Sequence, residues 1–141
     1  MVEVIFKPDP ERPGFYVIEK LPDNNQNPVL WGVALLPHVW RPPTDVFEVK
    51  DTVVVRVEIA GMRETDFNIL LDERDLTIHG QRPDISERRA YHQMEIRFGE
   101  FVSKVELPYA INAEKIEAIY QAGLLKVTLP KASPQKVPVE G

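Results

Sequence analysis

The chain of 141 residues has the length of one compact domain with tails, because a domain typically takes about 100 to 200 residues. Its 17 basic and 22 acidic side chains give a net charge of −5, which disfavours non-specific attraction to nucleic acid or anionic lipid. The absence of cysteine excludes disulfides, thiol nucleophiles and thiolate metal sites. No apolar run approaches the roughly 20 residues that span a bilayer, and the start lacks the pattern of a signal peptide. We therefore expect a cytoplasmic protein with neither a nucleic-acid nor a membrane partner.

The first 40 residues are predicted to form an N-terminal arm in which apolar patches alternate with prolines. Eight of the 13 prolines fall within residues 1–43. Proline removes a backbone donor and fixes one backbone angle, so these residues do not favour long helices or central strands. Such a segment can present apolar side chains to other proteins, or it can cover the domain as a poorly ordered extension or as a few edge strands. The sequence leaves both alternatives open.

From residue 45 to residue 130 apolar side chains mostly alternate with polar ones, which is typical of strands with one buried face. Seven stretches are predicted to be strands: 46–49, 52–59, 67–71, 76–78, 101–107, 116–120 and 124–129. Turn residues separate them, and no helical pattern long enough for a parallel crossover lies between them. The pattern therefore predicts an all-β fold in which two antiparallel sheets form a sandwich. Residues 83–94 are charged and weakly periodic, and we expect them to leave the sheets as an extended loop.

The sequence shows no motif of a catalytic or metal site. His38, His79 and His92 lack the close spacing of metal ligands, and His79 is interpreted as a surface residue of a strand. Neither a nucleophile elbow, nor a phosphate-binding loop, nor a dinucleotide fingerprint occurs. The acidic side chains are numerous, but most of them must be solvated surface groups. We therefore expect no enzyme, no cofactor and no bound metal.

Three stretches between residues 40 and 130 stand in a characteristic order. The first covers residues 43–62 and continues at 76–82, and the second leads from Gly99-Glu100-Phe101 to Leu107-Pro108. The third, residues 118–125, is similar to the pattern A-x-x-x-n-G-V-L, in which the glycine allows a tight reversal before the next strand. In this order and spacing the chain resembles the alpha-crystallin domain of the small heat-shock proteins, in their bacterial and plant form.

The resemblance implies an immunoglobulin-like β-sandwich over residues 41–130, between the arm of residues 1–40 and a short flexible C-terminal extension of residues 131–141. It also implies an ATP-independent holdase, a chaperone that binds unfolding client proteins and suppresses their aggregation. The alternative is a β-sandwich co-chaperone or adaptor that binds a folded partner. Such adaptors generally lack both a long loop before Gly99-Glu100-Phe101 and a terminal V-x-V segment, so the sequence favours the holdase.

The resemblance further implies sites for clients and for self-association. The expected client-contacting residues lie in the arm and are Phe6, Phe15, Tyr16, Val29, Leu30, Trp31, Leu35 and Leu36. A loop strand that crosses to the partner's sheet would form a homodimer and is expected at Arg89, Ala90, Tyr91, His92, Gln93 and Met94. The alternative for this segment is a mobile surface loop.

Larger assemblies in the family form when a C-terminal segment with two apolar side chains docks into a groove of a neighbouring domain. The corresponding residues here are Val137 and Val139. The expected groove residues are Phe67, Ile69, Ile116 and Ala118. Valine fills less volume than isoleucine, and at up to about 0.8 kcal/mol for each missing methylene the docking weakens about tenfold or more. We therefore expect small or polydisperse oligomers, down to a bare dimer.

One departure from the family pattern concerns the dimer interface. Ser103 stands where many relatives place an arginine, which leaves Lys104 as the nearest cation. A lysine ammonium cannot reproduce the two parallel hydrogen bonds of a guanidinium with a carboxylate. The salt bridge that relatives form at this point therefore lacks its arginine.

Overall fold

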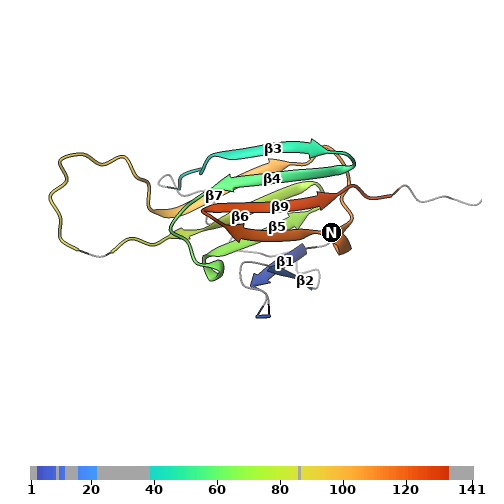
Figure 1. Cartoon of the computed structure of the whole chain (residues 1–141), viewed down its shortest axis with the longest axis horizontal. Coiled ribbons are helices and arrows are strands. Elements are labelled where there is room, and N and C mark those ends of the chain that lie inside the picture. Colours follow the sequence, from blue (N-terminus) through green and yellow to red (C-terminus); the bar gives the residue numbers. More distant parts are fainter. Residues whose placement is uncertain (1–2, 9, 12–15, 22–38, 86, 134–141) are drawn as a thin grey trace, which may run out of the picture.

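The computed structural model describes residues 3–8, 10–11, 16–21, 39–85 and 87–133. Two antiparallel sheets pack face to face (Figure 1), so the predicted all-β sandwich is confirmed. The five-stranded sheet has the order β2 (Tyr16–Leu21), β1 (Glu3–Pro8), β5 (Phe67–Asp72), β6 (Asp75–Arg82) and β7 (Gly99–Glu106). The four-stranded sheet has the order β3 (Thr44–Val49), β4 (Thr52–Glu58), β9 (Leu124–Pro130) and β8 (Glu117–Gln121). Two short 3-10 helices, η1 (Glu64–Asp66) and η2 (Ala113–Lys115), precede β5 and β8.

Each of the seven stretches predicted from alternation corresponds to one of the strands β3 to β9, and the stretches 52–59, 101–107 and 116–120 each extend one residue beyond their strand. β6 is longer than expected, because its polar and glycine positions continue the ladder with β5 and β7 as far as Arg82. The strands β1 and β2 come from the proline-rich arm, and β1 pairs with β2 along its whole length. The arm therefore adds two strands to the five-stranded sheet, as one of the two alternatives for this segment allowed.

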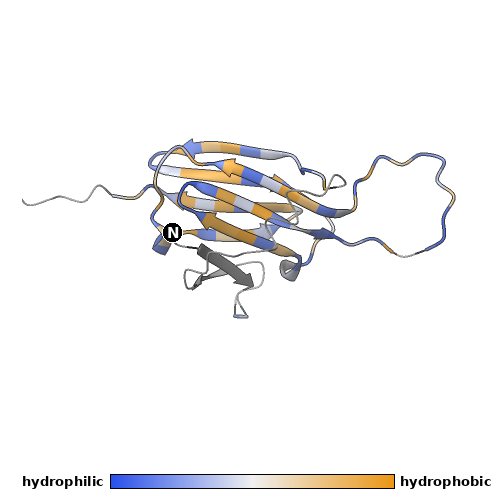
Figure 2. Ribbon diagram, turned by 180° about the vertical axis from the view of Figure 1, so that it is seen from behind, coloured by the Kyte–Doolittle hydropathy of each residue, from blue (hydrophilic) through white to orange (hydrophobic). Residues whose placement is uncertain are grey.

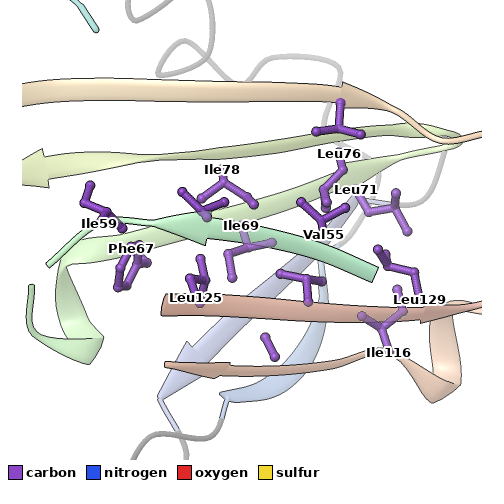
Figure 3. Close-up of a cluster of buried hydrophobic side chains, with 14 of the residues drawn as sticks. Val55, Ile59, Phe67, Ile69, Leu71, Leu76, Ile78, Ile116, Leu125 and Leu129 are labelled. Atoms are coloured by element: carbon purple, nitrogen blue, oxygen red, sulfur yellow. The ribbon is translucent and has the colours of Figure 1, made fainter. Parts of the chain in front are cut away.

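The alternating apolar side chains meet between the sheets and form one core (Figure 3). Val55 of the four-stranded sheet faces the same interior as Ile69 and Ile78 of the five-stranded sheet, and none of the three has exposed surface. Each such side chain stabilises the fold by about 1.5–3 kcal/mol on burial. Colouring by hydropathy shows the same alternation along the strands (Figure 2). The core therefore accounts for the period of two in the sequence.

The hairpin between β8 and β9 shows why the sequence needs a glycine there. Ala122 and Gly123 both have positive φ angles, 52° and 76°, in a two-residue turn between Gln121 and Leu124. A turn with two positive φ angles matches the twist of the flanking strands, and glycine adopts this conformation without a steric penalty. The Gly123 carbonyl then accepts a hydrogen bond of 2.9 Å from the Ile59 N–H, which ties the turn to the end of β4.

Gly80 on β6 permits a close approach that a side chain would block. A Cβ atom at this position would lie 2.1 Å from the Asp66 carbonyl oxygen and 3.0 Å from the Phe101 ring. We expect Gly80→Ala to lower the free energy of unfolding by about 1–3 kcal/mol, because backbone and core must both shift. Urea unfolding at a fixed protein concentration measures the change. Gln81→Ala, at the exposed neighbouring position, is the control and should stay within about 0.5 kcal/mol of the original chain.

Candidate self-association and client-binding surfaces

The loop between β6 and β7, residues 83–98, extends far from the sandwich (Figure 1). Its described residues are exposed and adopt no strand, as expected for a segment that leaves the sheets. The loop carries several exposed apolar side chains: Ile85, Tyr91, Met94, Ile96 and Phe98. Their exposed fractions reach 68% at Ile85 and 67% at Met94. All six residues predicted to form the dimer, 89–94, lie within this loop.

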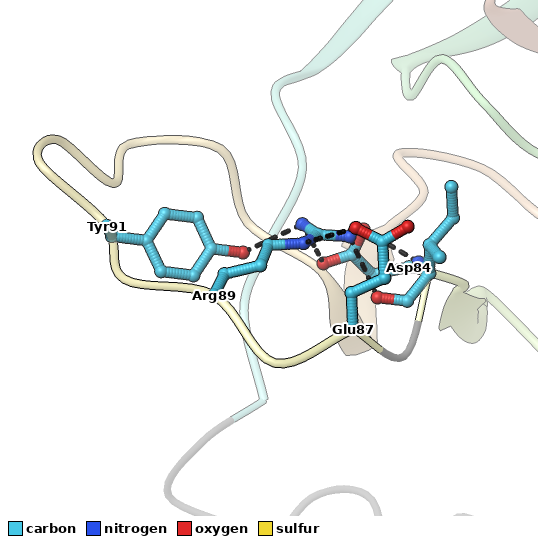
Figure 4. Close-up of polar contacts among 5 residues, drawn as sticks. Asp84, Glu87, Arg89 and Tyr91 are labelled. Atoms are coloured by element: carbon cyan, nitrogen blue, oxygen red, sulfur yellow. Dashed lines mark hydrogen bonds and ion pairs between the residues drawn. The ribbon is translucent and has the colours of Figure 1, made fainter.

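Arg89 holds the first half of the loop in a folded shape (Figure 4). Its guanidinium contacts the Asp84 carboxylate at 3.3 Å and donates hydrogen bonds to the Tyr91 hydroxyl at 3.0 Å and to the Ile85 carbonyl at 2.8 Å. Glu87 adds a further ion pair at 3.6 Å. The hydrogen bond with Tyr91 is the main cause that raises the pKa of Arg89 above its usual value. These contacts lie at the surface, where solvent screens them, so the loop shape they favour can be changed at small cost.

The two ends of the loop meet at a stack of aromatic and cationic side chains. The Arg82 guanidinium lies 4.6 Å from the centre of the Trp40 ring and 5.2 Å from that of Phe98. The Arg82 side chain also donates hydrogen bonds to the Arg97 carbonyl. The backbone of Trp40 pairs in turn with β7, since its N–H donates to the Glu100 carbonyl at 3.2 Å. These contacts therefore hold the two ends of the loop, at the end of β6 and the start of β7, next to each other.

The edge of the four-stranded sheet at β3 exposes apolar surface. In the described part of the chain β3 pairs with β4 on one side and has no neighbour on the other. Val46, Phe47 and Val49 have exposed fractions of 46%, 37% and 54%. Val46 is opposite Val55 in the register and so lies on the face that lines the core, but β3 is an edge strand and leaves this side chain partly exposed. An apolar edge strand of this kind is a template for pairing with another chain.

The four predicted groove residues lie in the core. Phe67 and Ile69 come from β5, whereas Ala118 lies on β8 in the other sheet and Ile116 directly precedes that strand. Their exposed fractions are 4%, 0%, 3% and 1%, so none presents a surface in this structure (Figure 3). The rings of Phe67 and Tyr120 are 5.0 Å apart, and the Tyr120 hydroxyl donates to the Ile59 carbonyl at 2.8 Å. The two strand edges therefore face each other across a filled interior.

The root of the C-terminal extension is anchored to the sandwich. The Lys131 N–H donates to the Asp51 carbonyl and the Ala132 N–H donates to the Ala110 carbonyl, both at 2.9 Å. The Lys131 ammonium lies 4.4 Å from the centre of the Tyr109 ring, and the Tyr109 hydroxyl donates to the Glu48 carboxylate at 2.7 Å. This hydrogen bond is the main cause that raises the pKa of Tyr109. The predicted docking residues of the extension, Val137 and Val139, lie outside the described residues.

The client-contacting residues predicted in the arm are placed only in part. Phe6 lies on β1, opposite Ile18 of β2, and Tyr16 begins β2. The other six lie outside the described residues: Phe15, Val29, Leu30, Trp31, Leu35 and Leu36.

Ser103 occupies a different environment from the one that an interface arginine needs. It is fully buried on the inner face of β7, and its hydroxyl lies 2.7 Å from that of Thr44 on β3. The pair forms a hydrogen bond between the two sheets of one molecule. At this position the chain therefore has an internal polar contact.

Among the described residues, no group of three or more His, Asp or Glu side chains could hold a metal ion. No helix of the described chain is long and apolar enough to span a membrane.

The fold, with its long loop before β7 and its turn at Gly123, is that of an alpha-crystallin domain. Residues 45–140 match the model of the Hsp20/alpha crystallin family. Heat shock protein 16 of Schizosaccharomyces pombe is 40% identical over 100 residues, which are 68% of this chain and 70% of that protein. The chain belongs to the Hsp20/alpha crystallin family, the small heat-shock proteins, as its sequence predicted. Members of this family are non-enzymatic stress-response chaperones that self-associate and bind clients.

Solved structures of relatives have the same architecture. Heat shock protein 16.0 from Schizosaccharomyces pombe superposes with a TM-score of 0.59 at 35% identity and covers 71% of this chain and 98% of that one. A small heat-shock protein from Xylella fastidiosa, described as having a distinct high order structure, superposes with a TM-score of 0.60 at 26% identity. That comparison covers 72% of this chain and 98% of the other.

Sequence reasoning missed the stack at the loop base and the anchor of the extension. Both join residues that are far apart in the chain, such as Trp40 with Arg82 and Glu48 with Tyr109. Alternation within one strand carries no information on such pairs. A local signal was present only at Trp40, a large aromatic residue between Pro37 and Pro42 that directly precedes the first predicted strand of the domain.

His79 lies on β6, as interpreted, but it is not a surface residue. Its neighbours Ile78 and Gly80 face the core, so its side chain points away from the four-stranded sheet, yet only 4% of it is exposed. Burial lowers the pKa of His79 below its usual value of 6.5, because the charged imidazolium loses its hydration.

This shift predicts a dependence of stability on pH. The unfolded chain takes up the proton near pH 6.5, whereas the folded chain takes it up only at lower pH, so the contribution is complete above 6.5 and is lost as the pH falls through the folded value. As the pH falls below about 6.5, this residue should lower the free energy of unfolding, by at most about 1.4 kcal/mol per pH unit. His79→Gln should remove that part of the fall in urea unfolding. His92→Gln, in the exposed loop, should leave it unchanged, and an equal effect of both variants would contradict the assignment.

Proposed function

We propose that the protein is an ATP-independent holdase that binds unfolding clients through apolar segments outside its core and so suppresses their aggregation. The observation that carries the proposal is that the chain belongs to a chaperone family and has apolar patches between the prolines of its arm. A folded protein normally avoids contiguous exposed apolar surface, since it promotes association. The net charge of −5 opposes unspecific aggregation of the chaperone itself. The length of the loop favours the holdase over a co-chaperone adaptor.

The arm is proposed to be the main client site. Its apolar residues lie between prolines, which hold extended backbone and limit burial in a core of their own. Phe6 and Tyr16 lie on the hairpin of β1 and β2, at the outer end of the five-stranded sheet. The apolar residues of Val29-Leu30-Trp31 and Leu35-Leu36 are proposed to contribute further client contacts.

The homodimer is proposed to form by strand addition at β3. An extended segment of one chain adds to an unpaired sheet edge through main-chain hydrogen bonds, while its side chains supply specificity. β3 offers such an edge with Val46, Phe47 and Val49 exposed, and the partner's loop offers Tyr91 and Met94. Because Arg82 fixes the base of the loop and the contacts of Arg89 lie at the surface, the loop beyond its base can change partners while the base stays in place.

Larger assemblies are proposed to form through the C-terminal extension, with Val137 and Val139 docking on a neighbouring molecule. The anchoring of Lys131 and Ala132 supports this role, because it fixes where the extension leaves the sandwich. A fixed exit lowers the entropy that docking must offset.

The first test of the holdase is suppression of thermal aggregation of an unstable client enzyme without nucleotide, followed by light scattering. We expect the full chain to suppress aggregation and Val29→Ser/Leu30→Ser/Trp31→Ser to lose most of this effect, because client contacts are apolar. The control Asn24→Ser/Asn25→Ser/Gln26→Ser changes polar residues of the same segment and should suppress as the original chain does. Absence of suppression by the full chain would refute the holdase. Equal suppression by the two triple variants would remove these three residues from the client site.

The second test concerns the dimer. In a chain that ends after Lys131, Val46→Lys/Val49→Lys should weaken dimerisation about tenfold or more, because charges at an edge strand oppose pairing and the loss of about 1.4 kcal/mol corresponds to that factor. Sedimentation equilibrium measures the constant, and circular dichroism checks the fold. Gln81→Lys/Gln121→Lys adds the same charge at exposed positions away from β3 and should change dimerisation little. An unchanged constant in the first variant would exclude β3 as the acceptor edge.

A further inference from the structure

Arg82 contacts two segments that are far apart in the sequence. It ends β6, at the point where the loop 83–98 leaves the sandwich (Figure 1). Its guanidinium lies 4.6 Å from the ring centre of Trp40, the last residue of the arm, and 5.2 Å from that of Phe98, the last residue of the loop. Its Nε donates a hydrogen bond of 2.7 Å to the Arg97 carbonyl. One side chain therefore joins the end of the arm to the end of the loop.

Trp40 lies on the edge of the five-stranded sheet and is held there by its backbone and its ring. Its N–H donates to the Glu100 carbonyl at 3.2 Å, and its carbonyl accepts from the Val102 N–H at 2.9 Å. Its ring centre lies 5.9 Å from that of Phe101, which is fully buried. The pairing with β7 is an isolated bridge, and short pairings of this kind open more easily than a full ladder. The ring contacts of Trp40 therefore contribute to keeping the arm on β7.

The contacts of Arg82 depend on the shape of its guanidinium. A guanidinium is planar, stacks on aromatic rings and has its N–H donors in a fixed arrangement, whereas a lysine ammonium is a compact point charge. Burial lowers the pKa of Arg82 below its usual value, because the charged group loses part of its hydration. Contacts between a cation and a ring strengthen when water is removed. A lysine at this position would keep the charge and lose most of these contacts.

We propose that Arg82 is a positioning residue that couples the arm to the loop 83–98, because it holds Trp40 and Phe98 in one arrangement. This inference rests on the proposed roles of the loop in the homodimer and of the arm in client binding. Coupling between two sites is reciprocal. A partner subunit that holds the loop also keeps Trp40 on β7. A client that draws the arm away from β7 releases the base of the loop and so weakens the dimer.

The proposed dimer contacts lie elsewhere in the chain. They are the exposed side chains of β3 and residues 89–94 of the loop. Trp40 and Arg82 belong to neither group. An effect of Trp40 on dimerisation would therefore pass through the residues that join it to the loop, and Arg82 contacts the rings at both ends of that connection.

A double-mutant cycle on the dimer tests the coupling in the full-length chain. Val137→Asp/Val139→Asp is present throughout, so that the proposed larger assemblies do not interfere. Arg82→Lys keeps the charge, and Trp40→Leu keeps an apolar side chain but removes the ring. Sedimentation equilibrium measures the dimerisation constant, and urea unfolding checks that each variant is folded. Arg88→Lys, at an exposed position of the loop, is the matched control.

We expect Arg82→Lys and Trp40→Leu each to weaken dimerisation about fivefold or more, which is the lower end of typical coupling between two sites. The double variant should be weakened by clearly less than the product of the two factors, since both changes remove the same contact. Arg88→Lys should dimerise like the original chain. Two factors that multiply, or an unchanged constant in Arg82→Lys, would overturn the coupling and leave the dimer itself intact.

Hydrogen exchange measures the coupling in the opposite direction, without a change at Trp40. The amides of Trp40 and Val102 form the bridge of the arm with β7 and report its opening. Arg82→Lys should raise the exchange rate of both amides about fivefold or more, whereas the amides of β9 in the other sheet should exchange as before. Equal acceleration throughout the sandwich would indicate a loss of overall stability and would overturn the coupling.

The variant at the β3 edge separates this inference from the proposed function. With Val46→Lys/Val49→Lys the amides of Trp40 and Val102 should also exchange faster, because no partner holds the loop. If this variant dimerises normally while Arg82→Lys weakens dimerisation, β3 is not the acceptor edge and the coupling stands. If it loses the dimer without any change at the two amides, the dimer forms as proposed and the coupling is wrong.

Discussion

The backbone at the edges of a β-sandwich is the constraint on which the other features of this molecule depend. The core buries the apolar side chains of the inner faces. At the edge of each sheet, however, the backbone N–H and C=O groups of the last strand have a ladder partner on one side only in the described part of the chain. The chain treats its edges differently. Trp40 caps part of β7, β1 covers part of β5, and β3 stays open with apolar side chains. The self-association proposed for this protein would complete an edge that one chain leaves open.

The fold could be predicted from the sequence because its main determinant is local. Alternation from residue 45 to residue 130 places Val55 and Leu125 in the core, and Gly123 marks a reversal that favours a residue without a side chain. The strands of the arm could not be predicted in the same way. The proline that ends β1, Pro8, and the short apolar runs are compatible with a strand and with an extended arm. The pairing of β1 with β5 is a contact over more than 60 residues.

The candidate sites were predicted with less precision, because an alternation of apolar and polar residues does not indicate which side chains are exposed to a binding partner. Phe67 and Ile69 were expected to line a groove, and they are indeed on the strand that faces β8, but their side chains complete the core of the single molecule. A side chain that points away from the core is also not necessarily exposed to solvent. His79 and Leu70 point away from the core and are nevertheless 4% and 5% exposed, so burial on the outer face of the five-stranded sheet has no signal in strand periodicity. Ser103 shows the same limit, because its partner Thr44 is 59 residues away.

The anchor at Tyr109 limits how far the molecule can reach. Ala132 is hydrogen-bonded to Ala110, and the four residues 133–136 separate it from Val137, the first valine proposed to dock, so five backbone steps join the two. Fully extended, five residues span at most about 16–18 Å. For Val137 to dock, the groove of a neighbouring molecule must therefore lie within this distance of the site where Tyr109 contacts Glu48 and Lys131. Glu48 belongs to β3, the strand at which the dimer is proposed to form. The start of the C-terminal extension is therefore attached to the proposed dimer strand, and the orientation of the dimer determines which neighbouring grooves the extension can reach.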